Sequence, residues 1–152
     1  MTGMGLINRV QVYPLHHQVA IIDHDAADAP RWETGQEPLV AGEQAVLVAT
    51  RHDLDPVELE VWVGTPATPP PGPLLFAGEL LTTGKGVEVG GLVVGDVVEV
   101  ELPAGWHRLR IYADQPGNAS RLRIVFDPAS DRSPKPAPPA NPDRRRSGEA
   151  SS

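Results

Sequence analysis

Residues 57–63 read Val57-Glu58-Leu59-Glu60-Val61-Trp62-Val63, with valine or leucine at every second position. Successive side chains of a β-strand point to opposite faces, so the four aliphatic residues would share one face. The two glutamates and the tryptophan would lie on the other. This alternation is typical of a half-buried strand, and it predicts a strand with one face in a hydrophobic core.

Comparable patterns occur on both sides of this segment. Residues 98–102, 106–113 and 121–126 also alternate, and the turn sequence Pro103-Ala104-Gly105 separates the first two. Further apolar segments cover 10–13, 18–22, 45–49, 74–81 and, interrupted by Gly90-Gly91, 87–94. Many short strands without a sustained helical period predict an all-β fold. We expect an antiparallel β-sandwich, with a barrel as the alternative.

Composition agrees with this fold class. The 152 residues include 15 glycines and 17 prolines, which break helices and mark turns. There is no cysteine, which excludes disulfides, cysteine-ligated zinc and a thiol nucleophile. Neither a signal-like N-terminus nor a long apolar run is present, so we expect a cytoplasmic protein without a membrane segment.

The chain divides at residue 128. Residues 128–152 are rich in proline, alanine, serine and arginine, and we expect a disordered tail after a folded domain at 1–127. The tail carries five basic and three acidic residues, which leaves eight basic against seventeen acidic in residues 1–127. This acidic domain should not bind nucleic acid directly, because such binding depends on Lys and Arg. It is suited to basic protein partners, although solubility alone also explains the charge.

Two long connections are expected. Residues 24–42 form a polar loop that contains Trp32, and loops of this length are uncommon unless they bind something or are mobile. Residues 64–73 are rich in proline and predict a stiff, extended connection. We interpret the second loop as a spacer rather than a docking segment.

Catalytic and metal-binding patterns are weak. The cluster with metal-ligand character is His16-His17 with Asp23, His24, Asp25 and Asp28. Adjacent histidines on a strand point apart, and the acidic residues lack the glycine and closing glutamate of an EF-hand loop, so no metal site is expected. The serines lie outside any G-x-S-x-G motif, and Gly84-Lys85-Gly86 lacks the P-loop spacing. We therefore expect no enzyme activity and no cofactor.

One polar strand face is unusual. Trp106, Arg108, Arg110 and Tyr112 would form a stripe of aromatic and guanidinium groups, with Arg121 and Arg123 on a neighbouring strand. These residue types are enriched in protein interfaces. Cross-strand pairing with the glutamates at 58, 60, 99 and 101 is the favoured interpretation. A protein interface and a sugar-stacking surface are the alternatives.

Two segments resemble the competence protein J family. They are Val10-Gln11-Val12-Tyr13-Pro14-Leu15-His16-His17-Gln18-Val19-Ala20-Ile21-Ile22-Asp23 and Val98-Glu99-Val100-Glu101-Leu102-Pro103-Ala104-Gly105-Trp106-His107-Arg108-Leu109-Arg110-Ile111-Tyr112. The resemblance covers about residues 8–127, and the proline-rich loop and the tail depart from it. It implies a small inhibitor of a DNA-entry nuclease, and no functional residue is carried over from it.

These observations favour a non-enzymatic protein-binding module, such as a nuclease inhibitor or immunity-type protein, with a basic nuclease or toxin as its partner. An acidic surface would bind the partner. Its candidate contacts are Asp23, Asp25, Asp28 and Trp32 in the long loop, with Glu58, Glu60, Glu99 and Glu101 as a second patch. The alternative is a sandwich that binds a glycan or other small ligand through Trp32, Trp62 or Trp106.

Overall fold

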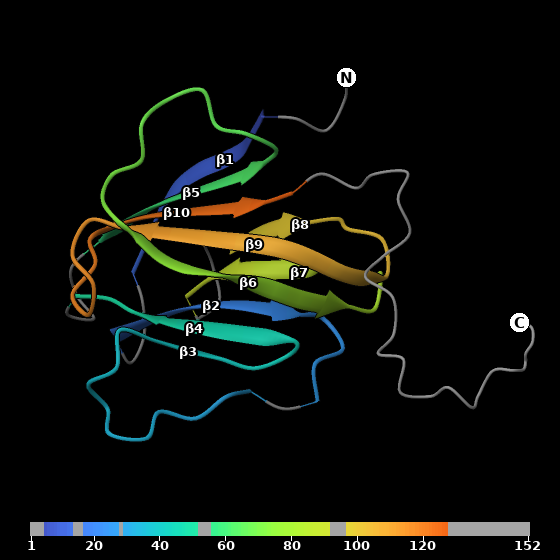
Figure 1. Ribbon diagram of the computed structural model, residues 1–152, viewed down its shortest axis with the longest axis horizontal. Coiled ribbons are helices and arrows are strands. Elements are labelled where there is room, and N and C mark those ends of the chain that lie inside the picture. The colour runs from blue at the N-terminus through green and yellow to red at the C-terminus, as the bar shows by residue number, and fades with distance from the viewer. Residues whose placement is uncertain (1–4, 14–16, 28, 52–55, 92–96, 128–152) are drawn as a thin grey trace, which may run out of the picture.

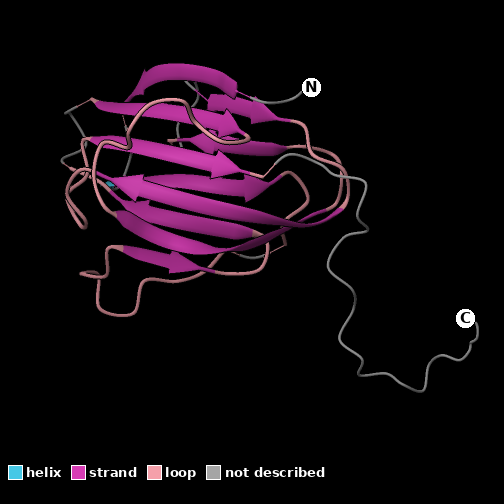
Figure 2. Ribbon diagram, turned by 45° about the horizontal axis from the view of Figure 1, so that its top comes forward, coloured by secondary structure: helices cyan, strands magenta, loops and turns pink. Residues whose placement is uncertain are grey.

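The computed structural model describes residues 5–13, 17–27, 29–51, 56–91 and 97–127. Within these ranges ten strands form two five-stranded sheets that pack face to face (Figure 1). No α-helix occurs there, and none of these residues forms a helix that could cross a membrane (Figure 2). The predicted β-sandwich is confirmed, and the sheets do not close into the alternative barrel.

Sheet A has the strand order β1-β5-β10-β9-β6. Its strands are β1 (Gly5–Val12), β5 (Val57–Val63), β10 (Arg121–Phe126), β9 (Gly105–Ala113) and β6 (Leu74–Thr82). Neighbours are antiparallel except β5 and β10, which run parallel from the pair Glu58/Arg121 to the pair Val63/Phe126. This parallel pair is a departure from the purely antiparallel pattern expected.

Sheet B has the order β3-β4-β2-β7-β8, and all its pairs are antiparallel. Its strands are β3 (Leu39–Ala41), β4 (Ala45–Ala49), β2 (Gln18–Asp23), β7 (Val87–Gly90) and β8 (Val97–Val100). Strand β3 lies inside the predicted loop 24–42 and shortens that loop to residues 24–38. Strand β7 ends at Gly90, whereas the predicted strand ran to Val94, and residues 92–94 lie outside the described ranges.

The core lies between the sheets and consists of the residues that the alternation selects. Val57, Leu59 and Val61 of β5 have no exposed surface. The inward-facing apolar residues of β8, β9 and β10 are also buried, ending with Phe126. Burying each such side chain contributes about 1.5–3 kcal/mol, so these strands supply much of the hydrophobic stabilisation.

The proline-rich loop 64–73 connects β5 to β6 and passes β10 and β9 on the way (Figure 1). Arg123 of β10 anchors this loop to sheet A. Its guanidinium donates hydrogen bonds to the Thr68 carbonyl at 2.8 Å and to the Thr68 hydroxyl at 2.7 Å. A Cβ at Gly72 would lie 2.2 Å from the Ala113 carbonyl oxygen, so the two backbones are in direct contact there. This spacer is attached to sheet A. The predicted tail at 128–152 lies outside the described residues.

Candidate functional site

The eight predicted contact residues do not form two continuous patches. Glu58 and Glu60 lie on the outer face of sheet A, because their neighbours in β5 point into the core. Glu99 lies on the outer face of sheet B for the same reason. Outer faces of a sandwich point in opposite directions, so the predicted patch of Glu58, Glu60, Glu99 and Glu101 is divided between two sides of the molecule.

Glu60 is nearly buried and fully engaged. Its Oε1 accepts hydrogen bonds from Arg123 Nε at 2.9 Å and from Trp62 Nε1 at 3.0 Å, and Arg9 pairs with Oε2 at 2.8 Å. Burial raises the pKa of Glu60, but the hydrogen bonds from Trp62, Arg9 and Arg123 outweigh it and lower the pKa overall. Glu60 therefore stabilises sheet A and is not available to a partner.

The same network covers Trp62. The Arg123 guanidinium carbon lies 5.3 Å from the centre of the Trp62 ring, a cation–π arrangement. Only 7% of Trp62 is exposed. Trp62 therefore cannot serve as a stacking platform for a sugar, and the alternative function loses one of its three proposed residues.

Asp23 is also structural. It is 2% exposed, and Oδ1 accepts hydrogen bonds from the Thr82 hydroxyl at 2.7 Å and the Thr83 amide at 3.0 Å. Burial raises the pKa of Asp23, but these bonds and one from the Asp25 amide outweigh burial and lower the pKa. Since Asp23 ends β2 and Thr82 ends β6, the carboxylate joins the two sheets. The predicted contact role of Asp23 does not fit this burial.

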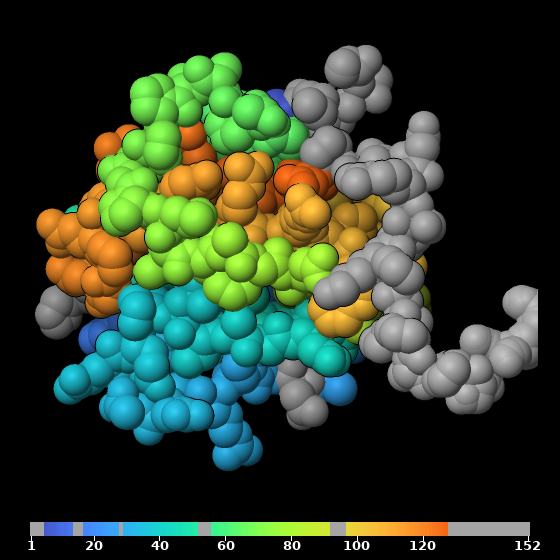
Figure 3. Space-filling view, viewed as in Figure 1, coloured from blue at the N-terminus to red at the C-terminus, as the bar shows by residue number. Residues whose placement is uncertain are grey.

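The long loop lies against the outer face of β2 and β4 in sheet B. Trp32 Nε1 donates to Gln18 Oε1 at 2.7 Å and places the half-buried ring on β2. Ala20, Ala45 and Leu47 lie outside the core cluster but are 6% exposed or less, which shows that the outer face of β2 and β4 is shielded. Residues 24–27 and 29–38 and the strands β3 and β4 form one blue-to-teal surface (Figure 3).

Glu37 fixes the shape of this loop, and no pattern in the sequence predicts this role. Its carboxylate accepts hydrogen bonds from the amides of Glu33, Thr34 and Gly35 at 2.7–3.1 Å. Backbone N–H donors, its own first and then those of Glu33 and Thr34, lower the pKa of Glu37 to about 2. The loop predicted as a binding element is thus organised around one carboxylate.

Accessible acidic groups concentrate on the side of sheet B. Glu88 and Glu99 face outward from β7 and β8, Glu101 follows β8 and is exposed, and Asp25 lies 3.5 Å from Lys85. His24 accompanies them, with Nε2 2.7 Å from Glu99 Oε1. The hydrogen bond to Glu99 is the main cause that raises the pKa of His24. Asp28 lies outside the described residues, so its predicted role stays a prediction.

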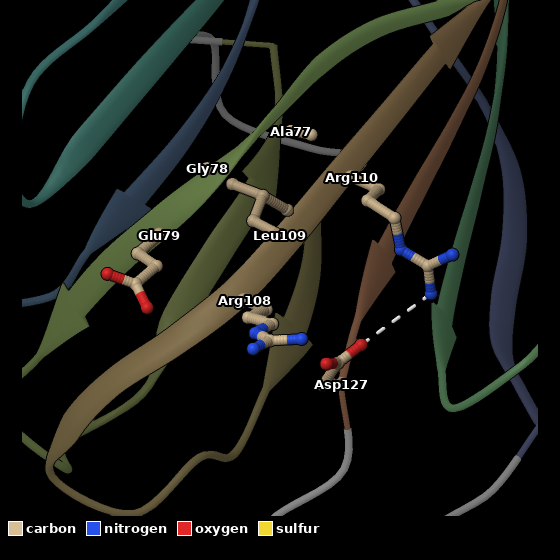
Figure 4. Close-up of a pocket in the computed structure, with 7 residues that line it drawn as sticks. All are labelled: Ala77, Gly78, Glu79, Arg108, Leu109, Arg110 and Asp127. Carbon is tan, nitrogen blue, oxygen red and sulfur yellow. Dashed lines mark ion pairs between the residues drawn. The ribbon is translucent and has the colours of Figure 1, made fainter. Parts of the chain in front are cut away.

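The stripe predicted on β9 lies on the outer face of sheet A. Arg121 pairs with Glu58 at 3.5 Å and Arg123 with Glu60, as the favoured interpretation expected, whereas Glu99 lies on the outer face of the other sheet. Arg110 pairs with Asp127 at 3.5 Å. Beside this pair lies a shallow hollow of about 500 Å³ (Figure 4), lined by Ala77, Gly78, Glu79, Arg108, Leu109, Arg110 and Asp127.

A search of solved structures finds the same fold in a nuclease inhibitor. The structure is that of ComJ from Bacillus subtilis, described as an inhibitor of the DNA degrading activity of NucA. The TM-score is 0.65 at 11% sequence identity, over 83% of this chain and 98% of ComJ. The resemblance predicted from two short segments is thus confirmed as a likeness in fold. No family model and no curated protein sequence matches the chain.

Proposed function

We propose that this chain is a non-enzymatic, cytoplasmic inhibitor that binds a DNA-degrading nuclease. The observation that carries the proposal is the fold likeness to a nuclease inhibitor over nearly all of that protein's length. The charge of the chain supports it, since the formal net charge is −7. A nuclease has a positive groove for its substrate, and an acidic protein surface can occupy such a groove.

The side of sheet B is the contact surface that we propose. The strands of sheet B contain no lysine or arginine, and the acidic groups around them are exposed. Of the predicted contacts, Asp25, Glu99 and Glu101 are accessible there, and Trp32 lies half-buried in the adjoining loop. Asp23 and Glu60 act by holding the scaffold, and Glu58 is paired with Arg121.

The test is inhibition of DNA hydrolysis. Nuclease fractions from the source cells are assayed on plasmid DNA with increasing amounts of the purified chain, at low and at physiological salt. We expect inhibition that weakens as salt rises, because exposed charge pairs are screened. Full DNA hydrolysis in every fraction at a large molar excess of the chain would contradict the proposal.

A pair of matched variants tests the surface. Asp25→Asn/Glu101→Gln removes two charges beside sheet B, and we expect inhibition to weaken by about tenfold or more. Glu58→Gln/Asp127→Asn removes two charges from the side of sheet A and should change inhibition less than about threefold. Equal losses in the two variants would show that total charge, rather than this surface, determines binding.

A further inference from the structure

Three side chains with metal-binding atoms meet on the outer face of sheet B. They are His24, directly after β2, Glu88 on β7 and Glu99 on β8. His24 Nε2 lies 2.7 Å from Glu99 Oε1 and 3.8 Å from Glu88 Oε2, and the three ligand atoms lie within 4.8 Å of one another. Strand pairing creates this arrangement, since Glu88 is directly opposite Glu99 and β7 pairs with β2.

The backbone positions the histidine. The His24 amide donates a hydrogen bond to the Gly86 carbonyl at 2.9 Å, which positions the His24 backbone beside β7. Gly86 has a φ of +116°, and a Cβ there would lie 2.9 Å from His24 Cδ2. The ring therefore occupies space that only glycine leaves free at this position. The imidazole packs against the Gly86 backbone and lies beside the two carboxylates.

The negative charges of the cluster favour the binding of a cation. Two carboxylates directly opposite on neighbouring strands repel each other, and Asp23 and Asp25 add negative charge nearby. Lys85 is the neighbouring lysine, and its ammonium group lies 3.5 Å from Asp25. All three side chains of the cluster are accessible, at 34% for His24, 41% for Glu88 and 54% for Glu99. An ion from solvent can therefore reach them.

We propose that His24, Glu88 and Glu99 form a binding site for a divalent transition-metal ion of the zinc class, with water completing the coordination. Zinc binds His nitrogen and carboxylate oxygen at about 2.0–2.2 Å in tetrahedral sites, which requires ligand atoms roughly 3.3–3.5 Å apart. The 2.7 and 3.8 Å separations in the structure lie on either side of that value. An imidazole ligand favours zinc, copper or nickel over magnesium and calcium. This inference does not depend on the proposed function.

The experiment is a calorimetric titration of the full chain with ZnCl₂ at neutral pH in a buffer that does not bind metals, with MgCl₂ as the comparison. One zinc ion per chain should bind, and magnesium should give no heat under the same conditions. His24→Gln and Glu99→Gln should each weaken zinc binding by about tenfold or more. Intrinsic tryptophan fluorescence confirms that each variant is folded.

A control variant distinguishes zinc binding at this site from zinc binding by other histidines. His16 and His17 are adjacent in the sequence, and His16→Gln/His17→Gln should bind zinc with unchanged affinity. Exposed Glu101→Gln controls for the loss of one negative charge near β8 and should also bind normally. Absence of zinc binding by the unmodified chain would overturn the proposal. So would normal binding by His24→Gln, or loss of binding by the control double variant.

Discussion

The outer faces of the two sheets differ in how their charges are compensated. The strands of sheet A carry five arginines and three glutamates, and these form cross-strand pairs such as Arg121 with Glu58. The strands of sheet B carry Asp23, Glu88 and Glu99 and no basic residue. Sheet A uses its charges to stabilise its own face, whereas sheet B leaves two of its three carboxylates exposed to solvent and to binding partners.

The strongest test of this contrast is Glu60→Gln. The substitution removes the charge that compensates Arg123, which is 4% exposed, and breaking a buried pair costs about 3 kcal/mol or more. Glu58→Gln on the same strand removes a solvent-exposed partner and should cost less than about 1 kcal/mol. Urea unfolding measures both. Equal costs would show that burial does not distinguish the two glutamates.

Asp23→Asn tests the connection between the sheets. The carboxylate accepts three hydrogen bonds at 2.7–3.0 Å, and bonds to a charged acceptor contribute about 1.5–3 kcal/mol. We expect a loss of about 2 kcal/mol in the free energy of unfolding. Glu99→Gln, on the exposed face of the same sheet, is the control and should change stability by less than about 0.5 kcal/mol. A stable Asp23→Asn variant would contradict the joining role.

Acid should act through the buried carboxylates. The pKa values of Asp23 and Glu60 are lowered in the folded state, so their stabilisation is present above the pKa of the unfolded chain. It is lost as pH falls below about 4 toward the folded pKa. Urea midpoints measured between pH 7 and pH 3 should therefore fall. They should fall less in Asp23→Asn, and an identical pH dependence in that variant would contradict this assignment.

The smallest effect is expected on the stripe of β9. Arg108 is exposed and forms no ion pair with the described residues, so Arg108→Gln should change stability by less than about 0.5 kcal/mol. Arg110→Gln removes the pair with Asp127 and should cost up to about 1 kcal/mol. Thermal unfolding of the two variants resolves this order. A larger loss for Arg108→Gln would show that this arginine has a structural role.

Strand positions and faces could be predicted because the period of two is local. Residues 57–63 and 106–113 show this, since their core and outer faces are those expected from alternation. The parallel pairing of β5 with β10 could not be predicted, because alternation specifies a face and not a neighbour or a direction. Strand β3 is three residues long, too short for a period to be seen.

The roles of the site residues are harder to predict from the sequence than the strands, because their contacts are made by segments that are distant in the chain. The sequence pattern predicts Asp23 and Glu60 as exposed acids, but each is buried and accepts a hydrogen bond from a residue about sixty positions further along, Thr82 and Arg123 respectively. Sequence proximity groups His24 with its neighbouring acids, whereas its partners Glu88 and Glu99 lie on two other strands. The polar face of β9 can be predicted from the sequence, because its charged residues alternate within one strand.

The order of sheet A has a consequence for how the chain folds during synthesis. Strand β10 is the central strand of that sheet, yet among the described strands it is the last to leave the ribosome. Until it emerges, sheet A can exist only as the separate pairs β1–β5 and β6–β9, each with an open hydrogen-bonding edge. Insertion of β10 closes both edges at once and buries Leu122, Ile124 and Phe126. Such late, long-range pairing favours slow folding.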